Sequence, residues 1–317
     1  MFNFKLFYTL KMNESCSIRG KKFNCSLAWL LERYKLSDKY TIEANTEVKF
    51  PGDPKFVFAT AASANYFPSL RLLIAKIKEH FGCTQKIIAY DLGNVTKNSE
   101  MMAELNSVCE LEWRIFDFSQ MVEGRVRHPK SFAWKILAMA EVLSEYDTVA
   151  WVDTSVLFSS DNLEPILTQI QNGKIGPVQL LTTTWHGKNI ATHPRMYDYL
   201  PMVANFGPTK QTNDLSGKEE PPQFESKFVI LHKTESTRQM MKWLGGDATF
   251  AALTFAALTL AAQTFAAPSQ SDTCGADTCG EDICGADICG ATLAAPTDAA
   301  PSQKDICGAD TCGAQSK

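Results

Sequence analysis

The chain has 317 residues, with 31 Lys and Arg against 35 Asp and Glu and a formal net charge of −4. This composition excludes a strongly basic nucleic-acid-binding protein, a collagen-like chain and a small disulfide-stapled toxin. The charge is unevenly spread, because residues 245–317 hold two lysines and nine acids, which leaves residues 1–244 at +3. We therefore expect one globular domain followed by a segment of a different kind.

Residues 1–50 are predicted to form an N-terminal lead or stem segment. The first ten residues are apolar but interrupted by Lys5, and they lack the length and flanks of a secretory signal. We expect membrane association only through an anchor that these residues do not convincingly supply. Sequons for N-glycosylation, which matter only in the secretory pathway, begin at Asn13, Asn24 and Asn94.

Residues 51–244 alternate short apolar runs with helical patterns, which predicts strands and helices in turn. Strands are expected at 55–62, 85–90, 111–118, 148–152, 178–184 and 227–231, and helical patterns occupy 67–81, 99–107, 132–143 and 163–170. The run at 148–152 is apolar throughout, as a parallel strand buried on both faces requires. The alternation predicts a mostly parallel, doubly wound α/β sheet.

Ligands of open α/β sheets bind beyond the carboxyl ends of the strands, and Asp153 follows the strand at 148–152. A carboxylate there can hold a divalent cation or a ribose hydroxyl, and a turn carboxylate is an equally open alternative. Arg127 and Lys130 precede Lys135 in the approach to this strand. Basic groups beside a carboxylate suit a diphosphate, although a solvated basic loop has the same pattern.

Several common ligand sites are excluded by the absence of their motifs. The first strand is followed by ATAAS, without the G-x-G-x-x-G turn of a dinucleotide-binding fold. The chain also lacks a P-loop, a nucleophile elbow and the H-E-x-x-H motif of zinc proteases.

Three runs, FVFATAAS, KIIAYDLG and FAWKILAMAEVLSEYDTVAWVDTSVLF, resemble the first four strands of the GT-A nucleotide-sugar glycosyltransferase fold. The segments YDLG, WVDTS, ATHPRMYDYLP and FVILHKTESTRQMMKWL are more closely similar to an uncharacterised, glycosyltransferase-like domain family of animals that is expanded in roundworms. The resemblance covers residues 56–244. It implies a GT-A-like domain that resides in the Golgi or ER lumen or is secreted.

The resemblance also implies a UDP- or GDP-sugar donor with Mn²⁺ or Mg²⁺. Asp153 matches the first acid of the DxD motif of these enzymes, at ribose or metal, and Ser155 replaces the second acid, which weakens a metal site. Other residues expected at the donor are Thr60, Asp91, Arg127, Lys130 and Lys135. The acceptor, a glycan or a protein, is expected beside Trp185, His186 and His193, for which a buried tryptophan and a helix-cap histidine are the structural alternatives.

Cys83 and Cys109 precede the second and third strands, which are neighbours in the GT-A order, so the resemblance implies a disulfide in a lumenal protein. The function that it implies is nucleotide-sugar-dependent glycosyl transfer, in a truncated or inactive member, and the catalytic residue is not assigned. The alternative is a non-catalytic, glycosyltransferase-like binding module.

Residues 245–317 form a low-complexity tail with a five-residue repeat and six of the ten cysteines. The five-residue period corresponds to a tandem DNA repeat of about fifteen bases. The two halves of the tail are explained if this one repeat is translated in two different reading frames. We favour a disordered tail. The alternatives are a membrane span at 248–267 and a zinc site in the cysteine ladder.

Overall fold

A computed structural model describes residues 9–11, 17–19, 28–43, 46–121, 127–187, 222–246, 307–308 and 311–312. The chain divides into two compact units. The described part of one unit includes two antiparallel pairs, β1 (Thr9–Lys11) with β2 (Ser17–Arg19) and β9 (Cys307–Gly308) with β10 (Thr311–Cys312). The other unit, Leu30–Thr192 with Glu219–Ala267, contains the main sheet.

The main sheet has six strands in the order β5-β4-β3-β6-β8-β7. They are β3 (Phe56–Ser63), β4 (Ile87–Gly93), β5 (Leu111–Ile115), β6 (Thr148–Val152), β7 (Val178–Gly187) and β8 (Pro222–His232). The pairs β3–β4, β3–β6 and β4–β5 are parallel, whereas β8 is antiparallel to both β6 and β7. Five of the six strands therefore run the same way, and the predicted mostly parallel α/β sheet is confirmed.

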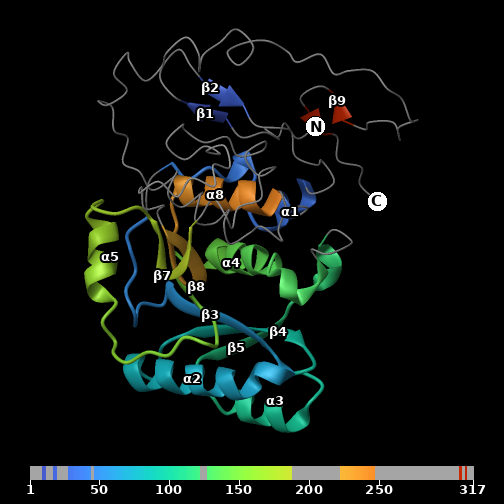
Figure 1. The fold of residues 1–317 in the computed structure, drawn as a ribbon, viewed down its shortest axis with the longest axis vertical. Coiled ribbons are helices and arrows are strands. Elements are labelled where there is room, and N and C mark those ends of the chain that lie inside the picture. Colours follow the sequence, from blue (N-terminus) through green and yellow to red (C-terminus); the bar gives the residue numbers. More distant parts are fainter. Residues whose placement is uncertain are drawn as a thin grey trace. The chain divides into compact units, whose positions relative to one another are not determined.

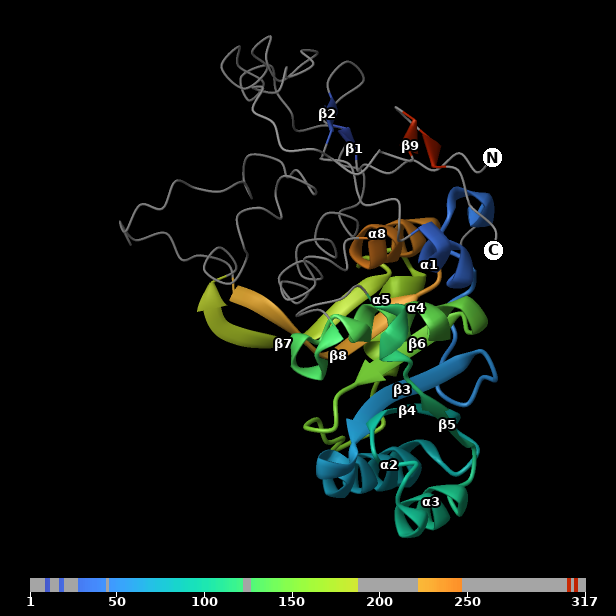
Figure 2. The same cartoon turned by 90° about the vertical axis from the view of Figure 1, so that its right-hand side faces the viewer.

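Helices cover both faces of this sheet (Figures 1 and 2). On one side lie α2 (Phe67–Phe81) and α3 (Ser99–Asn106), and on the other lie α4 (Trp134–Glu145) and α8 (Glu235–Gly246). The remaining helices are α1 (Ala28–Arg33), α5 (Glu164–Gln171) and single 3-10 turns at Asp38–Tyr40, Ala64–Tyr66, Phe118–Gln120 and Pro129–Ser131. The unit is thus a three-layer α/β/α structure.

The strand β3 shows how the residue pattern assigns side chains to the two helical layers. Phe56, Phe58 and Ala62 join the core cluster that also contains the apolar side of α2. Val57 and Ala59 alternate with them and are equally buried, so they point to the opposite face. The residues from Phe56 to Thr60 of the central strand are therefore buried on both sides, as all of β6 is.

The predicted bounds of α2 are confirmed at both ends. Pro68 stands in the first turn, where its missing N–H costs no hydrogen bond. Gly82 follows the last turn with φ of 85°, a conformation that glycine adopts without strain. This helix begins three residues after β3 ends, so its position is tied to the carboxyl edge of the central strand.

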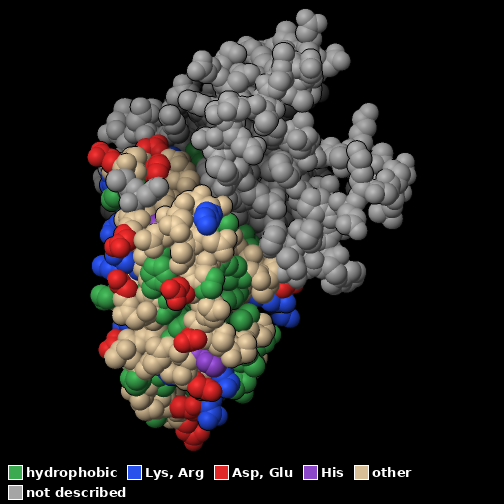
Figure 3. Space-filling model, turned by 90° about the vertical axis from the view of Figure 1, so that its left-hand side faces the viewer, with side chains coloured by type: hydrophobic (Ala, Val, Ile, Leu, Met, Phe, Trp, Pro, Cys, Tyr) green, Lys and Arg blue, Asp and Glu red, His purple; other side chains and the backbone are tan. Residues whose placement is uncertain are grey.

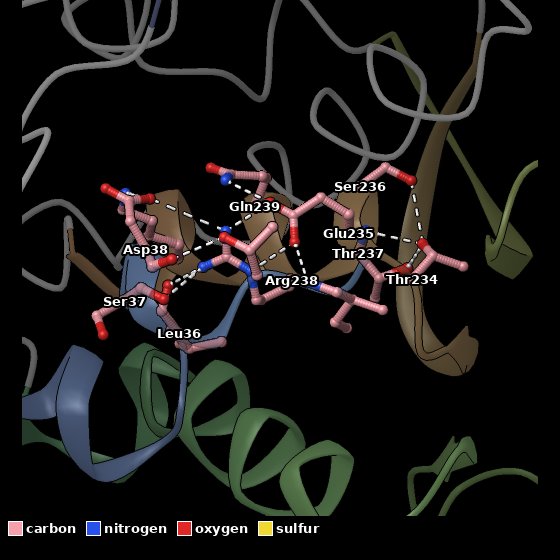
Figure 4. A network of polar contacts seen from close by, with 12 residues as sticks. Leu36, Ser37, Asp38, Thr234, Glu235, Ser236, Thr237, Arg238 and Gln239 are labelled. Atoms are coloured by element: carbon pink, nitrogen blue, oxygen red, sulfur yellow. Dashed lines mark hydrogen bonds and ion pairs between the residues drawn. The ribbon is translucent and has the colours of Figure 1, made fainter. Parts of the chain in front are cut away.

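The segment at 30–43, which we expected to belong to the N-terminal lead, is part of the sheet's unit. Leu30, Leu31 and Leu36 are buried. The buried Arg238 of α8 donates hydrogen bonds to the carbonyl oxygens of Leu36 and Ser37, at 2.9 Å for Ser37 (Figure 4). The segment is therefore joined to a helix about 200 positions further along the chain.

The charges on the unit are mixed in sign. On the face that Figure 3 shows, Lys and Arg side chains are interspersed with Asp and Glu side chains among the described residues. That face lacks the single-sign basic patch that nucleic-acid binding requires. None of the helices that the structure describes combines the length and the apolar character of a membrane span.

Cys83 and Cys109 form a disulfide in the structure, with their Cα atoms 5.8 Å apart. Cys83 lies between α2 and β4, and Cys109 lies between α3 and β5. Because β4 and β5 are parallel neighbours, their amino ends lie at the same edge of the sheet. The disulfide therefore links the segments just before β4 and β5, at the amino ends of these strands. Asp153 follows β6 at the opposite edge of the sheet, where the carboxyl ends of the parallel strands lie.

Candidate functional site

The connection between β3 and β6 is the topological switch point of the sheet. From β3 the chain first adds β4 and β5 on one side, and it then returns to place β6 on the other side of β3. Connecting segments diverge at such a point and leave a crevice beyond the carboxyl ends of the two strands. Asp153, the residue directly after β6, stands at this point of the sheet.

The Asp153 carboxylate is paired with the buried ammonium of Lys135. The Nζ atom of Lys135 lies 2.8 Å from both carboxylate oxygens. The indole Nε1 of Trp151 also donates to Oδ1 of Asp153, at 2.9 Å. The carboxylate is consequently fixed in orientation from two sides, and its side chain stays 26% exposed.

Lys135 is held in place by the first turn of α4 and by its surroundings. Its side chain is 3% exposed. The Nζ atom lies 3.3 Å from the carbonyl oxygen and 3.4 Å from the hydroxyl of Ser226, and 5.8 Å from the centre of the Trp151 ring. Burial lowers the pKa of Lys135, and the neighbouring Asp153 opposes that shift. The site therefore contains an internal ion pair with no net charge.

Phe132 is a residue of this site that the sequence did not indicate as functional. Its backbone is left-handed, with φ of 58° and ψ of 5°, which is strained for a bulky side chain. The ring is 42% exposed and its centre lies 5.6 Å from Nζ of Lys135. An exposed aromatic face beside the ion pair can stack on a base or a sugar ring. Its exposure and its left-handed backbone distinguish Phe132 from a core residue, and no pattern in the sequence reveals either of them.

The basic segment before α4 is attached to the same helix. Arg127, His128 and Lys130 are exposed, and the indole Nε1 of Trp134 donates to the carbonyl oxygen of Pro129 at 2.8 Å. The guanidinium of Arg127 donates to the carbonyl oxygen of Met121 at 3.1 Å. Arg127 and Lys130 therefore lie within eight positions of Lys135 along the chain, although neither contacts Asp153 among the described residues.

Asp91, expected at the donor, instead organises its own turn. Its carboxylate accepts hydrogen bonds from the backbone N–H groups of Gly93, Val95 and Thr96 and from the hydroxyl of Thr96, at 2.7 to 3.3 Å. These hydrogen bonds offset the effect of burial and lower the pKa of Asp91. Four bonds fill the acceptor positions of a carboxylate, so Asp91 shapes the edge of the site without a position left for a ligand.

Thr60 lies on the other face of the sheet from Asp153. It shares the parity of Phe58 and Ala62, which face α2, whereas Asp153 shares the parity of Trp151, whose ring packs on Trp134 of α4. The hydroxyl of Thr60 is buried and has no hydrogen-bond partner among the described residues. The structure therefore places Thr60 in the core under α2 and not beside the ion pair.

The residues at Asp153 do not fit a divalent-metal centre. Both oxygens of Asp153 are engaged by Lys135, and Ser155, in the place of a second acid, is exposed and offers only a neutral hydroxyl. No group of three or more His, Cys, Asp or Glu side chains gathers in the part of the chain that the structure describes. Mn²⁺ and Mg²⁺ bind through several oxygen ligands that include carboxylates, and this donor set is too small.

The remaining predicted residues are described in part or not at all. Trp185 and His186 lie on β7, where only the backbone is described. Asn94 is exposed and has φ of 69° in the turn after β4. The residues His193, Asn13 and Asn24, the predicted membrane span at 248–267 and most of the cysteine ladder lie outside the described residues.

Comparison with protein families identifies the first part of the chain. Residues 2–140 match a family described as protein of unknown function (DUF1647). The predicted membership of an uncharacterised domain family is confirmed, and the DUF1647 match begins within the segment that we expected to be a lead. It includes Lys135 and ends before Asp153. No protein with a curated description matches the chain.

The solved structures that this chain resembles include glycosyltransferases. The mannosyltransferase Ktr4p from S. cerevisiae in complex with GDP is 13% identical, with 80% of this chain and 79% of that chain covered and a TM-score of 0.42. Core-mannan synthase A from Aspergillus fumigatus, in its Mn/GDP form, is 8% identical, with 79% and 80% covered and a TM-score of 0.39. The bifunctional enzyme WbbM is 14% identical, with 66% and 39% covered and a TM-score of 0.40.

Proposed function

We propose that this DUF1647 chain is a glycosyltransferase-like domain that binds a nucleoside-diphosphate sugar at the carboxyl edge of β3 and β6. The observation that carries the proposal is the oriented, partly exposed carboxylate of Asp153 at the switch point of the sheet. An oriented carboxylate accepts hydrogen bonds from the hydroxyls of a ribose or a sugar. The exposed cations of Arg127 and Lys130 supply the positive charge that a diphosphate requires.

The exposure of each side chain indicates whether it would contact the ligand or act through another residue. Lys135 is buried and acts on Asp153, so it orients the carboxylate and neutralises it. Phe132 presents an exposed ring beside that pair and supports a stacking contact with the base or the sugar. The acceptor, a glycan or a protein, belongs in this proposal to the carboxyl-terminal part of β7, where Trp185 and His186 stand in the chain.

A non-catalytic binding module is favoured over an active transferase by one observation. The Asp153 carboxylate, on which a bound metal would depend, is already paired with Lys135 through both of its oxygens. A transferase must stabilise the charge that develops on its leaving diphosphate, by a metal or by cations in contact with it. Arg127 and Lys130 are the groups available here for that task.

Calorimetric titration of the full chain with UDP, GDP and their sugars tests the proposed site. Asp153→Asn is expected to weaken binding about 10- to 100-fold, because it removes charge-assisted hydrogen bonds of about 1.5–3 kcal/mol. The matched control is Asp147→Asn, since Asp147 precedes the same strand at its other end and pairs with Lys233. The control should change affinity by less than about twofold.

Two results would contradict the proposal. If none of these nucleotides binds the wild-type chain at millimolar concentration, the proposed function is wrong. If Asp153→Asn and Asp147→Asn bind as the wild type does, the function survives but the site does not lie at Asp153. Phe132→Ala adds a second measure, with an expected loss of about 2- to 10-fold for one aromatic contact of about 0.5–1.5 kcal/mol.

We also propose that the chain folds in the lumen of the secretory pathway. The Cys83–Cys109 disulfide supports this location, because disulfides persist in oxidising compartments and are rare in the cytosol. Peptide mapping of the secreted protein without reductant should recover the two peptides as one linked species. Recovery of both cysteines as free thiols from a secreted sample would contradict the lumenal assignment.

A further inference from the structure

We infer that Lys135 is a built-in cation of the candidate site, so that ligand binding at Asp153 does not depend on a divalent metal. This inference rests on the proposed function and deepens it by assigning the ligand class, a nucleoside-diphosphate compound bound free of metal. Its basis is the contact of one ammonium group with both oxygens of the carboxylate, at 2.8 Å each.

The acceptor positions of Asp153 account for the preference for a hydroxyl. A carboxylate has about four acceptor positions on its two oxygens. Lys135 uses one on each oxygen, and the indole N–H of Trp151 uses a second on Oδ1. One position on Oδ2 remains among the described contacts. A single hydroxyl donor fits that position, whereas a divalent cation needs several oxygen ligands and an unneutralised charge.

Lys135 cannot easily leave to make room for a metal. Its side chain is 3% exposed, and its ammonium contacts the carbonyl oxygen of Ser226, with the rings of Phe132 and Trp151 beside it. A metal that displaced it from Asp153 would leave a buried ammonium without its carboxylate, which is strongly unfavourable. The ion pair therefore opposes metal binding through the lysine as well as through the carboxylate.

The other acids near the end of β6 do not replace the missing ligands. Glu225, at the start of the described side chains of β8, pairs with Lys227 at 2.5 Å. Ser155 offers one neutral hydroxyl in an exposed turn. The charge that a diphosphate brings must then be met by the exposed cations Arg127 and Lys130, which stay charged whether or not a metal is present.

The test is a set of calorimetric titrations with UDP and GDP, each in EDTA and in Mn²⁺, and with Mn²⁺ alone. Wild-type affinity for the nucleotides is expected to differ by less than about threefold between EDTA and Mn²⁺. Lys135→Met is expected to weaken binding in EDTA at least about tenfold, because the exposed carboxylate then repels the diphosphate, and Mn²⁺ should restore it. The control is Lys78→Met, since the ammonium of Lys78 donates to the carbonyl oxygens of Cys83 and Gln85 and does not contact Asp153 among the described residues.

Each outcome decides the inference. A wild-type affinity that falls about tenfold or more in EDTA overturns it, and this comparison needs no variant to fold. A Lys135→Met protein that binds in EDTA as the wild type does also overturns it. If neither nucleotide binds at all, the proposed function fails and the assigned ligand class fails with it. Titration with Mn²⁺ alone then tests the role of Lys135 separately, and a wild-type Mn²⁺ site that Asp153→Asn removes would overturn that role.

Discussion

Replacement of Arg238 by methionine is expected to lower the free energy of unfolding by about 3 kcal/mol. Its side chain is 4% exposed, and its guanidinium pairs with Glu235, with Nε 2.7 Å from Oε2. It also donates to the carbonyl oxygens of Leu36 and Ser37. Methionine fills the space but leaves these acceptors without a donor. Breaking a buried pair costs about 3–5 kcal/mol, and the low end applies because the Glu235 and Asp38 side chains are about a third exposed.

The same network explains why the effect should be large for a single side chain. Glu235 also accepts from the backbone N–H of Ile42 at 3.0 Å and from Gln239 at 2.7 Å, and the buried Lys242 contacts Asp38 at 2.7 Å (Figure 4). These contacts join the segment at 36–42 to α8. Loss of Arg238 therefore loosens the attachment of a whole segment to the sheet's unit.

Urea or thermal unfolding of matched variants measures this effect. The control is Arg71→Met, because Arg71 is exposed and pairs with Glu104 on the surface, and such pairs contribute about 0–1 kcal/mol. For a unit of this size, 3 kcal/mol corresponds to a fall in Tm of about 6–12 °C. Equal stability of the two variants within about 1 kcal/mol would contradict the role assigned to Arg238.

The sequence predicted the elements of the sheet well because their signals are local. The uninterrupted apolar run at β6 and the proline and glycine that bound α2 each depend on a few neighbouring residues. The direction of β8 is not a local property. An apolar strand can pair either way, and the antiparallel course of β8 is seen only in its registers with β6 and β7. The helix α8 and the segment that it holds depend on contacts across about 200 residues.

The candidate site was predictable only as a neighbourhood. Strand ends and helix starts placed Asp153, Lys135 and the basic segment at one edge of the sheet. The direct pairing of Lys135 with Asp153 was not predictable, because it depends on the rotation of α4 over β6. Thr60 and Asp91 show the same limit. Thr60 faces the opposite side of the sheet, because side chains alternate along β3. The carboxylate of Asp91 accepts hydrogen bonds from the turn that follows β4.

Asp153→Ala is expected to lower the free energy of unfolding by about 3–5 kcal/mol, because it leaves the buried ammonium of Lys135 without its carboxylate. Lys135→Met in the same chain should restore much of that loss, since the second change removes the uncompensated charge and packs an apolar side chain beside Phe132 and Trp151. The two changes are therefore expected to be non-additive, with a coupling energy of about 0.5–3 kcal/mol.

The pH dependence of stability separates this electrostatic cause from a simple loss of packing. Burial holds the pKa of Lys135 below its ordinary value of 10.5, and Asp153 raises it. Between the folded and the unfolded pKa the unfolded chain binds more protons, so stability rises with pH in the window below 10.5. Without Asp153 that window extends to lower pH. Thermal unfolding at pH 7 and pH 10 should thus show Asp153→Ala gaining more stability, relative to wild type, than the double variant gains. An Asp153→Ala deficit that is the same at both pH values would mean that Lys135 does not depend on Asp153 for its charge.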